Sequence, residues 1–397
     1  MATFNLTDAS ALFKQKYGKI SDNVYNSANV MLGRIKKDYN FVGKEMKYPV
    51  PLGFSGGVGS GSLPEANAAN YGDMTITAKK VYAVCEIDRE TIKASLNNEG
   101  AFVEGTKHTV QKTVESWTRN ASRILFADGT GALGSFSGSS AGTAAVPILT
   151  ITAATWKEAN FEEGDFVNVN VLGSLWEVTI VVPSTRTVTL ERISGSDDLT
   201  MIGAGTHVVY MQKSRNNDPL GLKAVCDATN GTLYGVNVAR RWQSTQQAAA
   251  GAGVSTDRMN ELMLEVQRRS GKVPDLIITS FTQFRKILNL LEDQKQYVVE
   301  PRSKDLQGKI SFKGVEFMSS AGAVGIFPER FCEDDRLYAV NTNYITAYHR
   351  PDHGWFDDDG TVFLRGATTD TYGARYGGYY QNVIIPTFQG VITGLAT

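Results

Sequence analysis

Residues 99–127 read EGAFVEGTKHTVQKTVESWTRNASRILFA, and this stretch decides how the rest of the chain is organised. Its apolar side chains recur at intervals of seven, with two more in the intervening turns: Val103, Val110, Trp117, Ile124, Val114 and Ala121. This spacing places them on one face and predicts a single amphipathic helix. At about 1.5 Å rise per residue the helix would be roughly 43 Å long, and Gly129 would follow its end. We therefore expect this helix to serve as a spine on which other elements pack.

Upstream of this helix, the sequence predicts two extended segments. Residues 1–42 mix short polar runs with scattered apolar anchors, a pattern typical of an arm that packs on a neighbour. Residues 43–84 alternate like strands on both sides of a Gly- and Pro-rich centre, which predicts a long two-stranded hairpin loop with a flexible tip.

Downstream, residues 128–145 are rich in Gly, Ser and Ala and are interpreted as a linker. Residues 146–215 then carry short runs of Val, Ile and Thr between turn residues; the predicted strands are Ile148 to Ala153, Asp165 to Val171, Trp176 to Val182, Thr187 to Ile193 and His207 to Met211. This spacing predicts a small antiparallel barrel or sandwich inserted into a host domain that includes residues 85–145.

The second half of the chain mixes helices and strands, so the predicted fold class is α+β. Ser255 or Thr256 begins a helix that ends at Gly271, and residues 275–279 form a compact apolar strand. A second helix begins at Ser280, with an apolar face predicted at Phe281, Phe284, Ile287, Leu288 and Leu291. Further strands are predicted at 309–318, 337–348, 361–365 and 378–395.

Composition excludes several classes of protein. Hydrophobic residues make up 42% and charged residues 20% of 397 residues, which argues against a disordered chain. The formal net charge is −1, whereas a protein that binds nucleic acid tightly is usually more basic. The three cysteines are widely separated and are interpreted as reduced thiols. Neither a signal peptide nor an apolar run of about 18 residues is present, so we expect no membrane span.

Motifs for catalysis or metal binding are weak. Gly129, Gly131 and Gly134 match G-x-G-x-x-G, but the motif follows a helix instead of a strand, which favours a linker. His349 and His353 with Asp352 suggest a metal site, yet the intervening Pro351 forbids a helix, so a solvated turn is favoured.

Two other polar groups also favour structural roles. The acidic run at residues 357–359 lacks the ligand spacing of a calcium loop, and the basic pairs Arg240–Arg241 and Arg268–Arg269 are interpreted as solvated. Only four histidines occur, none in a nucleophile motif. We predict no enzymatic activity, no cofactor and no metal.

The order of these elements resembles the major capsid proteins of tailed bacteriophages, whose fold is shared with encapsulin-type shells. Local sequences carry the resemblance: Pro219-Leu-Gly-Leu222 followed by Arg241-Trp242, Pro274-Asp275-Leu-Ile-Ile-Thr-Ser280, Phe312-Lys-Gly-Val315, Arg336-Leu-Tyr-Ala-Val-Asn341, and a tail with Tyr379, Val383, Pro386 and Gly390. The resemblance covers nearly all of the chain except residues 146–213.

The resemblance implies a division into domains. Residues 1–42 would be the N-terminal arm, 43–84 the extended loop, and 85–145 the peripheral domain with the spine helix and linker. Residues 146–215 would be the inserted β-domain, 216–348 the axial domain, and 349–397 the C-terminal strands that return to the peripheral domain.

It also implies a function. Pentamers and hexamers of the chain would form the icosahedral head shell around double-stranded DNA, with weak and non-specific DNA contact. The protein would be assembled in the host cytoplasm and located in the virion. Candidates for contacts between subunits are Leu52, Phe54, Leu63 and Tyr71 in the loop, Leu12, Phe13 and Ile35 in the arm, and Trp117 on the spine helix.

Some relatives join their subunits through an isopeptide bond from a Lys on the extended loop. This chain has no Lys between Lys47 and Lys79, so we predict a shell without covalent cross-links. A separate scaffolding protein, a portal and decoration proteins are the other expected partners. The alternatives are an encapsulin-like nanocompartment shell and, more remotely, a β-rich adhesin or a nucleotide-dependent enzyme.

Overall fold

The chain is described here by a computed structural model, which covers residues 30–53, 61, 70–89, 99–170, 172–239, 241–292, 315–319, 322–357, 360–365 and 370–397. It divides into two compact units. Unit 1 comprises Met1–Met46, Ile76–Leu222 and Thr346–Val383, and unit 2 comprises Lys47–Thr75, Lys223–Ile345 and Ile384–Thr397.

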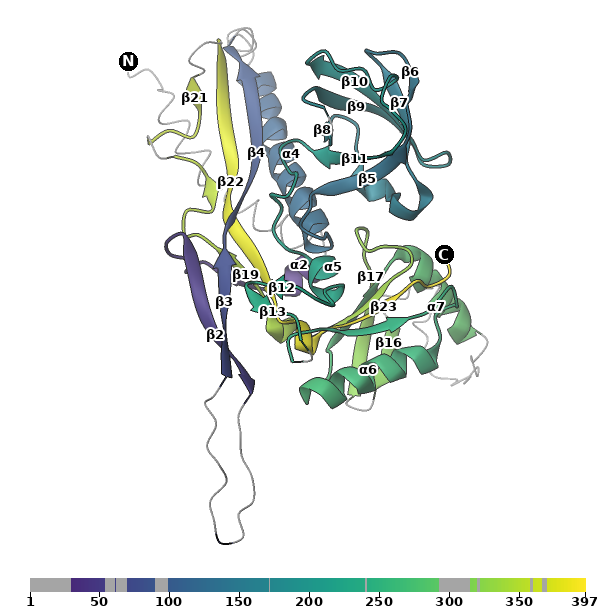
Figure 1. The fold of residues 1–397 in the computed structure, drawn as a ribbon. Helices are drawn as coiled ribbons and strands as arrows, with labels where there is room; N and C mark the ends of the chain where they lie inside the picture. Colours follow the sequence, from purple (N-terminus) through teal and green to yellow (C-terminus); the bar gives the residue numbers. More distant parts are fainter. Residues whose placement is uncertain are drawn as a thin grey trace, which may run out of the picture. The chain divides into compact units, whose positions relative to one another are not determined.

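Unit 1 is organised around a long helix and a long strand ladder. The helix α4 spans Glu99–Leu125, which confirms the predicted spine to within two residues at its end. Strands β4 (Lys79–Asp88) and β22 (Thr371–Ile384) pair antiparallel over the whole of β4 (Figure 1). The Trp117 indole of α4 donates a hydrogen bond to the Val81 carbonyl of β4 (3.2 Å). The helix therefore packs on one face of this ladder.

Shorter elements complete the sheet of unit 1. They are α2 (Val30–Arg34), β1 (Lys36–Asp38), β19 (Ile345–His349), β20 (Gly354–Trp355) and β21 (Leu364–Arg365). Strand β1 runs parallel to β19, β19 pairs with β22, and β20 and β21 also pair with β22.

The predicted arm needs correction in its described part. Met31, Leu32, Ile35 and Phe41 are all buried within this chain: the first two lie on α2, and the other two flank β1, which pairs with β19. Residues 30–41 are therefore not a free arm, and residues 1–29 lie outside the described part of the chain.

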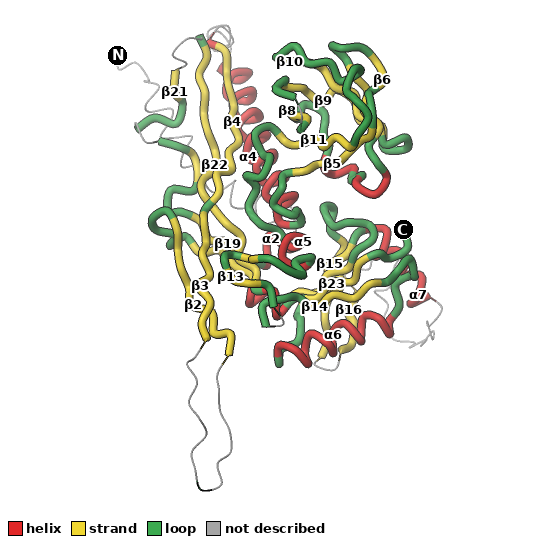
Figure 2. The backbone as a smooth tube through the Cα atoms, in the orientation of Figure 1, coloured by secondary structure: helices red, strands yellow, loops and turns green. Residues whose placement is uncertain are grey.

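A seven-stranded antiparallel sheet forms the rest of unit 1, in the order β5-β11-β8-β9-β10-β7-β6. The strands are β5 (Ala132–Ser137), β6 (Ala141–Gly142), β7 (Pro147–Thr150), β8 (Phe166–Val169), β9 (Leu175–Val182), β10 (Thr187–Ser194) and β11 (Thr206–Met211). The Thr152 amide just after β7 donates to the Ser135 carbonyl of β5 (2.7 Å), which closes the sheet into a barrel (Figure 2). All five strands predicted between residues 148 and 211 are present.

The interpretation of residues 128–145 as a linker is wrong, because two of the barrel strands, β5 and β6, lie within them. Gly134 is a strand residue for a steric reason. A Cβ atom at this position would lie 2.8 Å from Ile151 and 3.3 Å from Phe161, inside the barrel core. The small residues here therefore serve close packing.

Unit 2 contains a six-stranded mixed sheet in the order β14-β23-β18-β15-β17-β16. The strands are β14 (Thr245–Ala248), β15 (Leu276–Thr279), β16 (Val315–Ser319), β17 (Gly322–Pro328), β18 (Leu337–Val340) and β23 (Gly390–Thr393). Helices α6 (Thr256–Ser270) and α7 (Phe281–Glu292) share one apolar core with this sheet, and a short helix α5 spans Leu222–Cys226.

The two helices of unit 2 form largely as predicted. The Ser255 hydroxyl accepts a hydrogen bond from the Arg258 amide (3.3 Å), and Gly271 ends α6 in the left-handed conformation (φ 71°). On α7, however, Phe281 is 61% exposed. The buried position is taken by Gln283, which donates to the Asp334 carbonyl (2.7 Å) and the Ala396 carbonyl (2.6 Å). The prediction that Phe281 faces the core is therefore wrong.

Two predicted strands are each divided. The segment 337–348 is broken by a 3-10 turn at Thr342–Tyr344 into β18 and β19, which belong to different sheets. The segment 378–395 is broken by a 3-10 turn at Pro386–Phe388 into the end of β22 and β23. Of the strand predicted at 309–318, only residues from Val315 onward are described.

Two small sheets complete the fold. Strands β2 (Glu45–Gly53) and β3 (Asn70–Thr77) form a two-stranded sheet of their own, as predicted for the hairpin loop. Residues 79–84 of the predicted loop instead lie in β4, which pairs with β22, so the extent of the loop was predicted wrongly at this end. Strands β12 (Thr232–Leu233) and β13 (Val236–Asn237) form a tight antiparallel hairpin.

Candidate functional site

The contact candidates of the hairpin loop lie on or beyond the β2–β3 sheet. Tyr71 is 55% exposed and Leu52 is half-buried, so both present apolar surface outside the core. Phe54 and Leu63 lie outside the described residues, as do Leu12 and Phe13 of the arm. Neither side chain is enclosed within this chain.

Two other candidates are not available for such contact. Trp117 is 1% exposed and Ile35 is 6% exposed within this chain alone. Trp117 fills the space between α4 and the β4–β22 ladder, and Ile35 follows α2 in the core of unit 1. The proposal that they contact a neighbouring subunit is therefore wrong. A large apolar side chain is buried wherever the chain's own elements can cover it.

The base of the hairpin is fixed within unit 2 by the β12–β13 hairpin. The Thr75 amide of β3 donates to the Tyr234 carbonyl (2.8 Å), and the Tyr234 hydroxyl accepts from the Ile384 amide (3.2 Å). A Cβ atom on Gly72 would lie 3.0 Å from Val236 and 3.1 Å from Leu52, so these elements are in close contact. Tyr234 thus connects three segments that are far apart in sequence.

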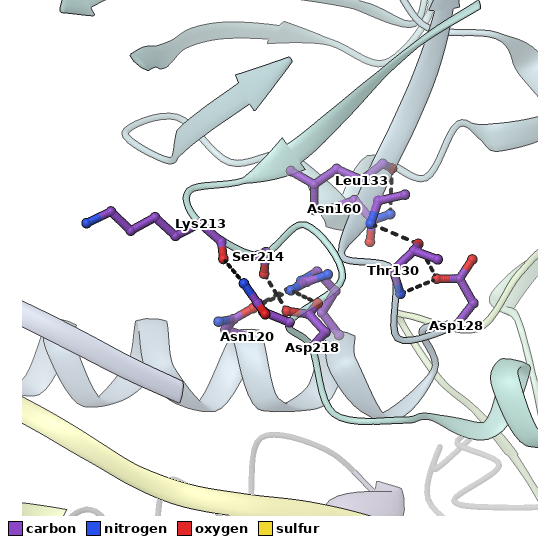
Figure 3. Close-up of polar contacts among 11 residues, drawn as sticks. Asn120, Asp128, Thr130, Leu133, Asn160, Lys213, Ser214 and Asp218 are labelled. Atoms are coloured by element: carbon purple, nitrogen blue, oxygen red, sulfur yellow. Dashed lines mark hydrogen bonds and ion pairs between the residues drawn. The ribbon is translucent and has the colours of Figure 1, made fainter. Parts of the chain in front are cut away.

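A buried ion pair lies where the chain enters and leaves the barrel (Figure 3). Arg123, near the end of α4, donates to the Asp218 carboxylate (2.8 Å), and each side chain is 5% exposed. Arg123 also donates to the Asn120 side-chain oxygen (2.8 Å), and the Ser214 hydroxyl donates to Asp218. The charges are thus compensated by several hydrogen bonds, as buried ions require.

The two connections to the barrel run side by side at this point. The Asn216 amide donates to the Thr130 carbonyl (2.8 Å). The Thr130 amide donates to the Asp128 carboxylate (2.9 Å) (Figure 3). Gly131 has a positive φ of 80°, and a side chain there would collide with the Ser214 backbone. Gly131 therefore serves this close crossing, whereas Gly134 of the same motif packs in the barrel core.

A second arginine of α4 holds the barrel one helical turn earlier. Arg119 donates to Asp165 and forms an ion pair with Glu162 (2.8 Å). Burial raises the pKa of Asp165, and the Arg119 charge opposes that shift. Both acidic residues lie in the barrel, between β7 and β8. Sequence reasoning missed Arg119 and Arg123, whose only signal is their spacing of four residues on the spine helix.

Of the two histidines considered for a metal site, His349 is buried and His353 is half-buried, whereas Pro351 and Asp352 between them form an exposed turn. The prediction of a solvated turn therefore holds for the turn and is wrong for the two rings. His349 is fully buried at the end of β19, and its ring lies 4.7 Å from that of His353. The His353 ring lies 4.8 Å from Trp117, and the His349 ring stacks on Tyr39 (5.2 Å) and Tyr380 (5.1 Å). Sequence could not show this, because these aromatic neighbours come from three separate segments.

Burial also sets the charge of this pair. Burial lowers the pKa of His349 to about 2, and the nearby His353 and Lys37 make smaller contributions in the same direction. Burial also lowers the pKa of His353 to about 4, again with a smaller contribution from Lys37. Both rings are therefore neutral near pH 7. Among the described residues, no group of three or more His, Cys, Asp or Glu side chains could hold a metal ion. None of the described helices is long and apolar enough to span a membrane.

Comparisons with known proteins place the fold. No family model matches the chain, and no curated protein matches it in sequence. A chain of the Cyanophage A-1(L) capsid asymmetric unit matches it with a TM-score of 0.57 at 11% identity, over 92% of this chain and 93% of that one. The capsid of a native GTA particle matches with a TM-score of 0.45 at 10% identity, over 92% and 90% of the two chains. The cyanophage match confirms the predicted α+β phage capsid fold.

Proposed function

We propose that this chain is the major capsid protein of a tailed bacteriophage, and that copies of it form the icosahedral head shell around double-stranded DNA. The observation that carries the proposal is the match to the cyanophage capsid chain, because it extends over nearly the full length of both chains. That match also favours a phage shell over a cellular nanocompartment. We assign the chain no catalytic activity.

The elements take the following roles in this proposal. Helix α4 and the β4–β22 ladder form the peripheral domain, and the six-stranded sheet with α6 and α7 forms the axial domain that meets its copies at the capsomer centre. The barrel is an inserted domain held by Arg119 and Arg123. The β2–β3 sheet carries the extended loop that lies on a neighbouring subunit.

The β2–β3 sheet supports self-assembly on physical grounds. A two-stranded sheet is marginally stable in water unless another surface covers it. Tyr71 and Leu52 would bury their apolar surface on a neighbouring subunit, and closed rings of five and six would repeat that contact. The near-neutral net charge fits a shell that holds DNA weakly and releases it. A scaffolding protein, a portal and decoration proteins remain proposed partners.

Negative-stain electron microscopy and sedimentation of the purified full chain test the proposal directly. We expect closed icosahedral shells or rings of five and six subunits, and DNA protected from nuclease in native particles. Protein cargo in place of DNA would indicate a nanocompartment. A monomer or dimer under all assembly conditions would contradict the proposal. Denatured shells should run as a single monomer band, because the loop between Lys47 and Lys79 contains no lysine.

A further inference from the structure

The connection between α5 and β12 contains the only Asn-Gly pair of the chain, Asn230–Gly231. Residues 229–232 are all exposed, so water surrounds this segment. The β12–β13 hairpin that follows is instead held by three buried side chains, Leu233, Tyr234 and Val236. The Asn-Gly pair therefore lies at the exposed, open end of a fixed hairpin.

The atoms of this pair are unhindered. In the part of the chain that the structure describes, neither the Asn230 side-chain amide nor the Gly231 backbone amide forms a hydrogen bond. Gly231 has a positive φ of 76°, and a Cβ atom built on it would have no other atom within 4 Å. Because glycine has no side chain to crowd its nitrogen, this nitrogen can approach the side-chain carbon of Asn230.

Asn237 on β13 provides a contrast within the same hairpin. It is also exposed, but Val238 follows it, and the Val238 amide donates a hydrogen bond to the Gly231 carbonyl (2.9 Å). The nitrogen after Asn237 is therefore engaged, and a β-branched side chain crowds it. The two asparagines share their exposure and differ in the backbone nitrogen that follows them.

We propose that Asn230 is a site of spontaneous deamidation. The Gly231 backbone nitrogen attacks the side-chain carbonyl carbon of Asn230, and the new C–N bond closes a five-membered imide. The side-chain nitrogen leaves as ammonia, which carries away the proton of the Gly231 amide. One water molecule then opens the imide at either carbonyl, which gives aspartate or isoaspartate. The sum is the hydrolysis of one amide to a carboxylate and ammonium, so the step consumes only water.

The expected consequence is local, because the two ends of the hairpin are held differently. Isoaspartate adds one methylene to the main chain before Gly231, which displaces the Gly231 carbonyl from the Val238 amide. At the other end, the Thr75 amide donates to the Tyr234 carbonyl (2.8 Å) and does not involve the modified segment. Each modified copy gains one negative charge, while the base of the β2–β3 sheet stays held. The inference does not depend on the proposed function.

Mass spectrometry of the folded full chain tests the proposal. Trypsin releases residues 224–240 as one peptide that contains both Asn230 and Asn237, so Asn237 is an internal control. After incubation at mildly alkaline pH, fragment ions should place a gain of one mass unit on residue 230. A sample digested before incubation sets the baseline. The gain should be about tenfold faster than on residue 237 or more, and an isoaspartyl methyltransferase should label the product at residue 230.

Two variants separate the chemistry from its surroundings. Asn230→Gln should stay unmodified, because its longer side chain would have to close a less favourable six-membered ring. Val238→Gly removes the crowding at Asn237 but keeps its backbone amide in reach of the Gly231 carbonyl. Residue 237 should therefore still react more slowly than residue 230 in this variant. Equal rates there would contradict the protection that we assign to the hydrogen bond.

The remaining outcomes decide the proposal and its consequence. A folded chain without a mass gain on residue 230, beside a urea-denatured chain that shows one, would overturn the proposal, because the folded backbone would then prevent ring closure. Equal gains on residues 230 and 237 of the unmodified chain would also overturn it. Hydrogen exchange of the deamidated fraction should be faster at the Val238 amide and unchanged at the Thr75 amide. Faster exchange at Thr75 would contradict the local consequence.

Discussion

Helices α4 and α6 are both held against β-structure, but by opposite means. Helix α4 holds the barrel with two arginines, Arg119 and Arg123, which form ion pairs with Asp165, Glu162 and Asp218. Helix α6 packs on the six-stranded sheet through the buried apolar side chains Met259, Leu262, Met263 and Val266.

This difference shows how the sequence determines each of the two contacts. The apolar contact of α6 follows from a repeat of 3.6 residues and is visible in the sequence. The polar contact of α4 depends on acidic partners that lie 46 and 95 residues away from their arginines. The polar contact therefore fixes the position of the barrel on α4 without a periodic pattern in the sequence. Removing it should lower the free energy of unfolding more than removing the apolar contact of α6.

The strongest test of this comparison is Arg123→Ala. The variant leaves the Asp218 carboxylate buried without its partner, and breaking such a pair costs about 3–5 kcal/mol. Urea unfolding followed by tryptophan fluorescence should show this loss, since Trp176 lies in the barrel core. Arg268→Ala is the matched control, because the pair of Arg268 with Glu265 is exposed on α6, is screened by water, and should leave stability almost unchanged.

A further variant separates the charge from the packing. Replacing both partners, as R123M/D218L, should recover most of the stability lost in Arg123→Ala, because no buried charge is left uncompensated. If the double variant is as unstable as the single one, the hydrogen bonds of Asn120 and Ser214 to this pair matter more than its charges.

On the apolar side, Leu262→Ala should cost about 2–5 kcal/mol, through lost burial and the cavity left behind. Leu262 lies against Gly390 of β23, where a Cβ atom would come within 3.0 Å of it, so the site is closely packed. Leu264→Ala on the same helix is the control, because Leu264 is 51% exposed. A loss for Leu262→Ala below about 1 kcal/mol in urea unfolding would show that the sheet tolerates a cavity.

The sequence predicted elements whose signal is local. Helix α4, the cap residues Ser255 and Gly271, and barrel strands β7 to β11 all follow from short-range periodicity and turn chemistry. The sequence-based predictions failed where the role of a residue depends on a neighbour that is far away in the sequence. Gly134 lies in a strand because Phe161 and Ile151 occupy the space of its missing side chain.

The same reasoning explains why the burial of Phe281 and of the two histidines was predicted wrongly. Gln283 replaces Phe281 in the core because its amide reaches two backbone carbonyls from distant segments. His349 is buried and His353 is half-buried because Tyr39, Trp117 and Tyr380 lie around them. Neither environment can be deduced from adjacent residues. The contact candidates Ile35 and Trp117 failed likewise, since apolar character does not reveal which surface covers a side chain.

The buried histidines extend the comparison to neutral polar groups. The pKa of His353 is lowered to about 4 in the folded chain, so in the range between about pH 4 and 6.5 the unfolded chain binds more protons than the folded one. Stability contributed by the neutral ring is complete above about pH 6.5. It decreases as the pH falls, by about 1.4 kcal/mol per pH unit for each histidine.

Urea unfolding at pH 7 and pH 5.5 measures this dependence. Lys37 and Asp352 are the charged groups that act on His353, and comparison with His353→Phe isolates the contribution of this ring. His353→Phe should reduce the loss between these two pH values by about half. An unchanged pH dependence in this variant would contradict the assignment.

The smallest expected effect concerns the exposed end of the polar contact. The Glu162 side chain is 55% exposed, so its ion pair with Arg119 is screened by water and Glu162→Ala should cost less than about 1 kcal/mol. Asp165→Ala removes the buried partner of the same arginine and should cost more, because Arg119 is itself only 15% exposed. Urea unfolding of both variants in low and high salt would compare them. If Glu162→Ala were the more damaging, the barrel would be held at its solvent-exposed edge, and the contrast with the apolar contact of α6 would rest on Arg123 alone.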